Sequence, residues 1–138
     1  MADKIEFELV SPERLILSEP VDMVVVPGTE GNFGALPGHA PFASTVRADV
    51  IEVYEGNTVR ERIFVAGGFA EVTPDRVTVL ADEAINLDRL DRAAVEQSIR
   101  ALEQEIGDSD TEAERAPLAA RLAIEQAKIA ALTRAGKA

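Results

Sequence analysis

The 138-residue sequence contains no cysteine and no tryptophan, and it has only one histidine. Without cysteine there can be no disulfide scaffold, no thiol nucleophile and no thiolate metal site. A zinc site normally takes several His or Cys ligands, and His39 stands alone. We therefore expect no metal site, and the cysteine usage fits a reducing compartment.

Long apolar runs are missing as well. No uncharged stretch approaches the roughly 18 residues that a membrane-spanning helix needs. The first ten residues, MADKIEFELV, carry acids where a signal peptide has a basic end and an apolar core. We expect a soluble, intracellular protein without direct membrane insertion.

Basic residues are scarce, 14 Lys and Arg against 25 Asp and Glu, for a net charge of −11. Residues 87–138 carry eight basic and ten acidic residues, which leaves six basic and fifteen acidic residues for 1–86. An acidic surface of this kind repels nucleic acid and anionic lipid, so neither is expected as a partner. It suits a basic protein partner, and it serves solubility equally well.

The composition changes near residue 87. All five Phe and the single Tyr precede it, and 13 alanines follow it. In KIEFELV, the apolar Ile5, Phe7 and Leu9 alternate with charged residues, which is typical of a half-buried strand. Gly56-Asn57 and Pro74-Asp75 separate further runs of this kind as turns. Residues 1–86 are predicted to form an all-β domain, an antiparallel sandwich or flattened barrel.

Residues 87–138 repeat with a period near 3.6, which indicates two helices. The apolar stripe, interrupted at Gln97, comprises Leu90, Ala93, Ala94, Ile99, Leu102, Ile106, Leu118, Leu122, Ile129 and Leu132. The connection is short, so the helices are predicted to form an antiparallel hairpin.

Four residues mark the predicted ends of these helices. Gly107 and Gly136 are expected to end the first and the second helix. Ser109 and Glu112 have the spacing of a capping box. Pro117 allows two alternatives, a second helix that begins near Ala116 or one that begins near Thr111 and is locally distorted. We favour the start near Thr111.

The segment PGTEGNFGALPGHAP, residues 27–41, holds four of the nine glycines and three of the seven prolines. A P-loop needs Gly-Lys followed by Ser or Thr, and the sequence has none. The three-residue spacing of its first glycines is not the dinucleotide fingerprint. His39, Ser44 and Asp49 could supply a catalytic triad, but no nucleophile elbow accompanies them.

The glycines and prolines of this segment are therefore interpreted as shaping a loop. Phe33 and Leu36 are expected to point into the sandwich. His39 has two readings: it forms a hydrogen bond inside its own loop, or the rigid loop displays it to a partner.

This segment, followed by VAGGFAEVTPDRVTVLAD and an alanine-rich helical hairpin, resembles the epsilon subunit of the bacterial rotary ATP synthase (the delta subunit of mitochondria). The resemblance covers almost the whole sequence. It implies a ten-stranded sandwich, residues 1–86, and a two-helix hairpin, residues 87–138. It also implies a non-catalytic rotor subunit of the central stalk, beside the gamma subunit and on the c-ring, which couples proton flow to ATP synthesis.

The implied location is the cytoplasmic face of the cell inner membrane, as a peripheral part of the complex. The alternative implied by the family is mainly regulatory. In that reading the hairpin reaches the alpha/beta hexamer and inhibits ATP hydrolysis in response to nucleotide.

The resemblance also implies which residues meet partners. The turn from Glu30 to Gly34 matches the loop that faces the c-ring, and Asn32 stands where some relatives carry an acid, which argues against a charge-based contact there. Ser11, His39 and Ser44 match positions that face gamma. The full predicted interface is Ser11, Glu30, Gly31, Asn32, Phe33, Gly34, Pro37, Gly38, His39, Pro41 and Ser44.

A degenerate nucleotide motif, LDRLDRA, lies at the start of the first helix. ATP-binding relatives carry an arginine three residues after the aspartate that corresponds to Asp88. Arg92 comes one residue late, about 100° further round the helix. We therefore predict no cofactor, with ATP binding weak or absent, and interpret the charged residues as helix-start capping.

Overall fold

The computed structural model describes residues 3–137, which fall into two compact units that divide between Asp88 and Arg89. The first unit holds ten strands, and a short 3-10 turn, Leu87–Arg89, follows them. The strands are β1 (Ile5–Ser11), β2 (Arg14–Val21), β3 (Met23–Gly28), β4 (Gly31–Ala35), β5 (Phe42–Thr45), β6 (Asp49–Glu55), β7 (Thr58–Ala66), β8 (Phe69–Val72), β9 (Arg76–Leu80) and β10 (Glu83–Asn86).

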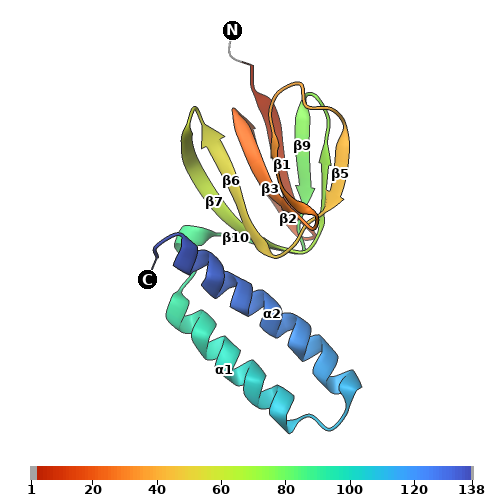
Figure 1. Ribbon diagram of the computed structural model, residues 1–138, viewed down its shortest axis with the longest axis vertical. Coiled ribbons are helices and arrows are strands. Elements are labelled where there is room, and N and C mark those ends of the chain that lie inside the picture. The colour runs from red at the N-terminus through yellow and green to blue at the C-terminus, as the bar shows by residue number, and fades with distance from the viewer. Residues whose placement is uncertain (1–2, 138) are drawn as a thin grey trace. The chain divides into compact units, whose positions relative to one another are not determined.

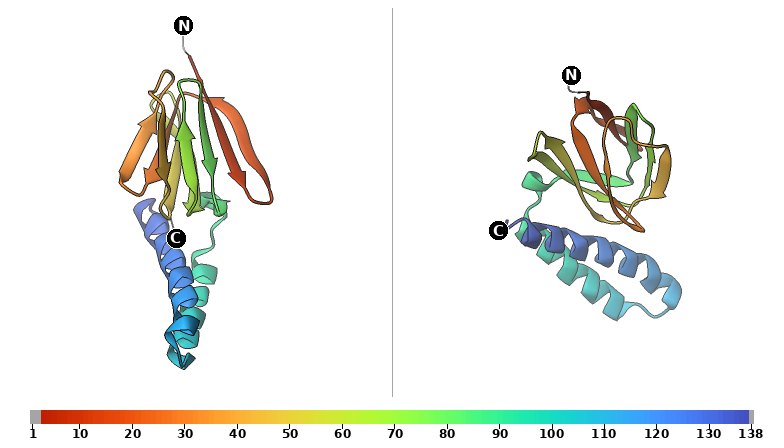
Figure 2. Two further views of the ribbon diagram at one scale, coloured as in Figure 1. Left: turned by 90° about the vertical axis from the view of Figure 1, so that its right-hand side faces the viewer. Right: turned by 45° about the horizontal axis from the view of Figure 1, so that its top comes forward.

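The strands form two sheets of five, which face each other in Figures 1 and 2. We name them sheet A, in the order β2-β1-β9-β8-β5, and sheet B, in the order β10-β7-β6-β3-β4. The predicted ten-stranded sandwich is confirmed. One pair, β1 with β9, is parallel, so sheet A is mixed rather than purely antiparallel.

The core lies between the sheets and follows the alternation of the sequence. Ile5, Phe7 and Leu9 are fully buried on the inner face of β1, and Glu6 and Glu8 lie on its outer face. The inner face of sheet B contributes β-branched residues from β3, β6 and β7. Because each strand presents one apolar face, stacking the two sheets removes both faces from water.

The segment after β4 corrects one prediction. Phe33 is partly buried against the core, and its ring meets that of Phe42 edge-on with 4.9 Å between centroids. Leu36, however, is 53% exposed, so its predicted inward orientation is wrong. Ala35 already fills the last inward position of β4, and the chain then turns, with the His39 amide donating to the Leu36 carbonyl at 3.0 Å.

The second unit is the predicted pair of helices, α1 (Arg92–Asp108) and α2 (Glu112–Arg134), which lie side by side in Figure 2. The carboxylate of Asp91 caps α1 by accepting from the Ala93 amide at 3.0 Å. Gly136, with a φ of 71°, ends α2 as predicted. Its amide donates to Thr133, and the Lys137 amide donates to Leu132, which is a Schellman motif.

Two predictions about the interhelical turn are wrong. The capping box is formed by Thr111 and Glu114, whose side chains each bond the other's backbone amide. Ser109 instead follows the end of α1, where its hydroxyl donates to the Glu105 carbonyl at 2.8 Å. Gly107 lies within the last turn of α1 and does not end it.

The start of α2 is where we favoured it, because Thr111 is its N-cap and the helix runs on through Pro117. The inner face of α1 differs from the predicted stripe. Val95 and Leu102 are its buried residues, and Ala93 and Ala94 are exposed. Alanine carries too little apolar surface for the pattern alone to distinguish the two faces. Neither helix in the described part of the protein combines the length and hydropathy of a membrane span.

Candidate partner interface

An apolar row crosses the outer face of sheet A near the ends of its strands. Register places Leu15 of β2 opposite Val10 of β1, Val10 beside Leu80 of β9, and Leu80 opposite Phe69 of β8. Leu15, Leu80 and Phe69 are 55%, 54% and 45% exposed. Adjacent strands lie about 4.8 Å apart, so the row spans roughly 14 Å of surface. We call these four residues the apolar row.

Polar residues border the apolar row on the same face. The next positions along the strands are Glu8, Thr78 and Glu71, which are paired across β1, β9 and β8. The Glu8 carboxylate also accepts from Arg76 at 3.0 Å. Contiguous exposed apolar surface with a polar rim is typical of a protein interaction site, whereas single exposed apolar residues are ordinary.

The sequence reasoning missed the apolar row, although a signal existed. Ala70 and Val79 are buried, so their strand neighbours Phe69 and Leu80 must point outward. The turn at Pro74-Asp75 then sets the register that makes Phe69 and Leu80 direct neighbours.

The predicted interface residues separate into two groups at opposite ends of β4. In the first group, Ser11 ends β1, where its hydroxyl donates to the Arg14 carbonyl at 3.3 Å. Glu30 and Gly31 are exposed in the turn between β3 and β4, and the exposed Asn32 accepts from Arg47 at 2.6 Å. Gly34 is also exposed, but it lies near the other end of β4.

The second group surrounds His39 in the connection from β4 to β5. Its Nδ1 atom donates to the Ala40 carbonyl at 2.6 Å, so the hydrogen bond inside its own loop is present. The ring is half-buried, with its centroid 6.4 Å from that of Phe42. Pro41 is exposed in the same connection. Ser44 lies further along β5, where its hydroxyl donates to the Thr45 carbonyl at 2.8 Å and lies beside Gly28, so Ser44 belongs with the first group. Display of His39 to a partner stays a prediction.

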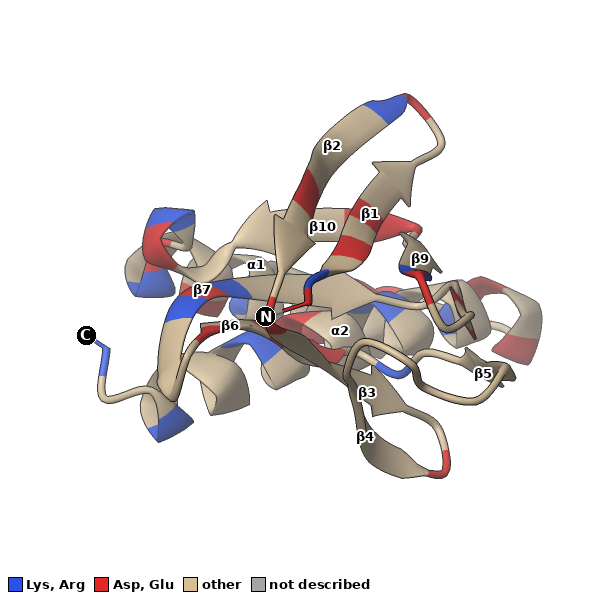
Figure 3. Ribbon diagram, turned by 90° about the horizontal axis from the view of Figure 1, so that it is seen from above, with Lys and Arg blue, Asp and Glu red and all other residues tan. Residues whose placement is uncertain are grey.

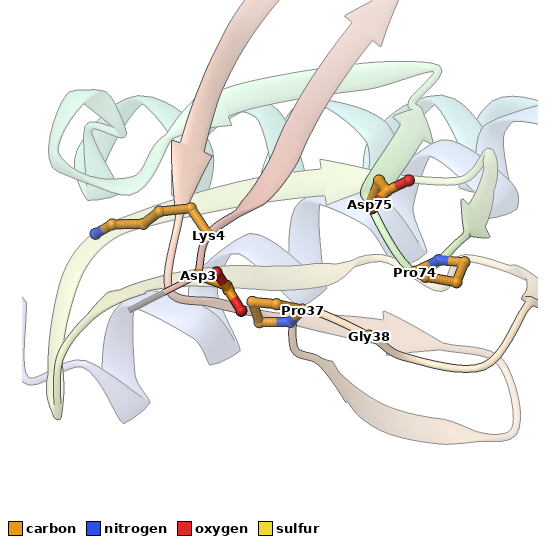
Figure 4. A pocket seen from close by; sticks show the side chains of 6 residues that line it. All are labelled: Asp3, Lys4, Pro37, Gly38, Pro74 and Asp75. Atoms are coloured by element: carbon orange, nitrogen blue, oxygen red, sulfur yellow. The ribbon is translucent and has the colours of Figure 1, made fainter. Parts of the chain in front are cut away.

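A shallow cavity of about 390 Å³ opens beside this second group. Its lining residues, labelled in Figure 4, are Asp3, Lys4, Pro37, Gly38, Pro74 and Asp75. The Gly38 amide donates to the Pro74 carbonyl at 2.8 Å, which fastens the two turns together.

Lys4 points away from Asp3 and Pro37 in Figure 4, and its ammonium pairs with Asp22 at 2.8 Å. That hydrogen bond, with a second from the Gly56 amide at 2.6 Å, holds the pKa of Asp22 below its ordinary value. Asp22 therefore stays ionised further into the acid range than a free aspartate.

Acidic residues are spread over both sheets: Figure 3 shows red bands on β1 and β2, and β6 carries three acids. Arg60 lies within ion-pair distance of three carboxylates, those of Glu19, Glu55 and Glu61. Burial raises the pKa of Glu19, against the opposite effect of Arg60. Residues 1–86 have fifteen acidic and six basic residues, so this part of the protein keeps a net negative charge.

At the start of α1, Arg92 is engaged inside the hairpin. Its Nη2 atom donates to the Thr133 hydroxyl and to the Lys137 carbonyl, each at 3.0 Å. The arginine thus joins the first residue of α1 to the end of α2. The described residues contain no cluster of three or more His, Cys, Asp or Glu side chains that could hold a metal ion.

Two family models match the sequence. Residues 4–87 match the beta-sandwich domain of the ATP synthase delta/epsilon chain, and residues 91–138 match the C-terminal domain of the ATP synthase epsilon chain. Among individual proteins, the ATP synthase epsilon chain of Rhodospirillum rubrum is 58% identical over 131 residues, which cover 95% of this protein and 98% of that one. The epsilon chain of Rhodospirillum centenum is also 58% identical, over 134 residues that cover 94% and 92% of the two proteins.

Two solved structures of mitochondrial ATP synthases also contain a subunit that is similar to this protein. A subunit in the cryo-EM structure of the Euglena gracilis mitochondrial ATP synthase, comprising OSCP, F1 and the c-ring, is similar with a TM-score of 0.79 and 28% identity. The match covers 94% of this protein and 81% of that subunit. A subunit in the central stalk and c-ring structure of the Tetrahymena thermophila mitochondrial ATP synthase shares the fold, with a TM-score of 0.62 at 13% identity.

Proposed function

The chain belongs to the ATP synthase epsilon family, as the resemblance predicted, and from that membership we propose that it is a non-catalytic rotor subunit of the central stalk. In this role it docks on the gamma subunit and on the c-ring and couples proton flow to ATP synthesis. The proposal places it on the cytoplasmic face of the inner membrane. It also divides the protein into a docking sandwich, residues 1–86, and a helical hairpin, residues 87–138.

The apolar row is the observation that carries this proposal. A rotor joint must resist torque, and surface ion pairs contribute only about 0–1 kcal/mol each and weaken with salt. A durable joint needs a buried apolar centre with a polar rim. Leu15, Leu80 and Phe69 supply the centre on sheet A. Ser11, a residue predicted to face gamma, directly follows Val10 of the row, so we assign this face to gamma.

The second contact is the turn between β3 and β4, which we assign to the c-ring. Glu30 and Gly31 are exposed there and free of core packing. The net charge of −9 on residues 1–86 favours basic loops on both partners, because complementary charge speeds and orients docking.

We expect Leu80→Gln to weaken docking on the stalk by at least about tenfold. Leu80 lies between Val10 and Phe69, and a polar side chain at the centre of an interface loses the burial that such centres provide. The measurement is the affinity of the purified protein for a catalytic complex that contains gamma but lacks this subunit.

Thr78→Gln is the matched control. Thr78 lies on the same strand and the same outer face, two residues before Leu80, and it belongs to the polar rim. It should bind within about twofold of the unmodified protein, since rim positions carry little binding energy. Equal binding by Leu80→Gln and the unmodified protein would remove the apolar row from the joint.

We also expect no one-site binding isotherm when the protein is titrated with Mg-ATP at millimolar concentration. A nucleotide would have to compete for Arg92 with Thr133 and with the carbonyl that ends α2. Isothermal titration calorimetry on the full-length protein is the measurement, and a clear one-site isotherm would contradict the prediction. Such an isotherm would instead favour the regulatory alternative.

A further inference from the structure

The turn between β3 and β4 is fastened to the end of β5 and to the segment that follows it. The Thr29 amide donates to the Thr45 carbonyl at 3.0 Å, and the two threonine hydroxyls lie 2.7 Å apart. The Arg47 amide donates to the Pro27 carbonyl at 2.9 Å. Since β3 belongs to sheet B and β5 to sheet A, these bonds tie the turn to both sheets.

The guanidinium of Arg47 completes this arrangement. Its Nη1 atom donates to the Gly28 carbonyl at 2.6 Å, on the strand that enters the turn. Its Nη2 atom donates to Oδ1 of Asn32 at 2.6 Å, on the strand that leaves it, and pairs with Asp49 at 3.3 Å. A planar guanidinium can hold both sides of a turn at once, whereas a lysine ammonium is a single point of charge.

The bond to Arg47 also decides what Asn32 can offer to another molecule. A side-chain amide has an acceptor oxygen and a donor nitrogen. The oxygen accepts from Arg47 through one of its two lone pairs, and Asn32 is exposed at the edge strand β4. The nitrogen keeps two donor hydrogens that the bond to Arg47 does not use, and these can bond an acceptor on a partner.

We propose that Arg47 is a positioning residue, which fixes the turn of residues 28–32 and aims the Asn32 amide nitrogen at a hydrogen-bond acceptor on the rotor partner. The proposal rests on the proposed function, because that assigns the turn to the c-ring. The partner's acceptor is a carbonyl or side-chain amide oxygen. Glu30 is the charged residue of this turn. Its carboxylate can accept a hydrogen bond from a donor that lies next to that acceptor on the partner.

The first arm of the experiment measures the turn itself in the purified full-length protein. Arg47→Ala should speed hydrogen exchange of the Thr29 amide by about tenfold, while exchange from the strands of the core stays the same. Arg47→Lys should also speed exchange, because one ammonium cannot bond both Gly28 and Asn32 in the same geometry. Asn32→Asp should leave exchange unchanged, since a carboxylate oxygen accepts from Arg47 equally well.

Arg62→Ala is the matched control for this arm. Arg62 lies on β7 of sheet B and is also paired with an acid across the sheet, Glu52, at 3.6 Å. Its loss should not affect exchange at Thr29. Unchanged exchange in Arg47→Ala would overturn the positioning role.

The second arm measures affinity for membranes that carry the c-ring and gamma but lack this subunit. Arg47→Ala and Asn32→Asp should each bind about tenfold more weakly, the first because the turn is loose and the second because the donor is gone. Arg62→Ala should bind normally. Since Asn32→Asp keeps the turn in place, its weaker binding cannot come from a folding defect.

Leu80→Gln on the same membranes separates the two possible failures. If Leu80→Gln binds weakly while Asn32→Asp binds normally, the inferred contact is wrong and the proposed docking stands. If Leu80→Gln and the turn variants all bind normally, the proposed docking itself is wrong.

Discussion

Replacing Gly68 with alanine is expected to lower the free energy of unfolding of the sandwich by at least about 4 kcal/mol. Gly68 has a φ of 106°, and a Cβ atom there would overlap the Leu80 carbonyl oxygen and lie 2.9 Å from the Ala81 Cα. Both atoms are backbone at the end of β9, so no side-chain rotation relieves the clash. Backbone strain adds about 1–3 kcal/mol. The melting temperature of the variant should fall by roughly 15–30 °C.

Gly38→Ala separates strain from crowding in this prediction. Gly38 also has a positive φ, 85°, but a Cβ atom there meets nothing within 4 Å. Only the strain of about 1–2 kcal/mol applies, so its melting temperature should fall by roughly 5–15 °C. Thermal unfolding followed by circular dichroism measures both variants. If the two melting temperatures fall equally, contact with the backbone at the end of β9 is not the reason that position 68 needs glycine.

Much of the fold could be predicted from the sequence because the local residue patterns agree with the final packing of the strands. Ile5, Phe7 and Leu9 alternate with acids, and the alternation alone orients β1 between core and solvent. Gly56-Asn57 gives a two-residue turn between β6 and β7, as expected. The parallel pairing of β1 with β9 has no local signal, because it joins segments some 70 residues apart and depends on the whole sheet.

The ends of the helices were harder to predict, since several residues compete for each cap. Ser109 with Glu112 and Thr111 with Glu114 both have capping-box spacing. The structure uses the second pair, which lets the Ser109 hydroxyl bond the end of α1. Sequence spacing alone offers no way to rank two overlapping boxes.

Only part of the candidate interface could be predicted, because its residues come together from separate strands. Residues of the 27–41 segment stand out by composition, yet they end up at both ends of β4. The apolar row comes from four strands, and no single strand contains more than one of its members. Arg47 likewise looks ordinary in sequence, and its importance lies in contacts with Gly28 and Asn32, 19 and 15 residues away.

Phe7 and Phe69 lie on the same sheet and face opposite ways. Phe7→Ala should therefore mainly lower the stability of the sandwich, and Phe69→Ala should mainly weaken docking. Phe7 is fully buried between the sheets. Phe7→Ala removes a large core side chain and leaves a cavity, which should lower the free energy of unfolding by about 3–5 kcal/mol. Denaturant unfolding of the purified protein is the measurement.

Phe69→Ala should cost less than about 1 kcal/mol in the same measurement, because Phe69 is already 45% exposed and packs on only one face of sheet A. It should instead weaken docking on the stalk by at least about tenfold, since aromatic side chains at interface centres carry much of the binding energy. A large loss of stability in Phe69→Ala would contradict its place on the outer face. Natural selection for stability alone gives no reason to keep a phenylalanine half in water, so a small loss of stability with a large loss of docking would mean that a partner supplies the missing burial.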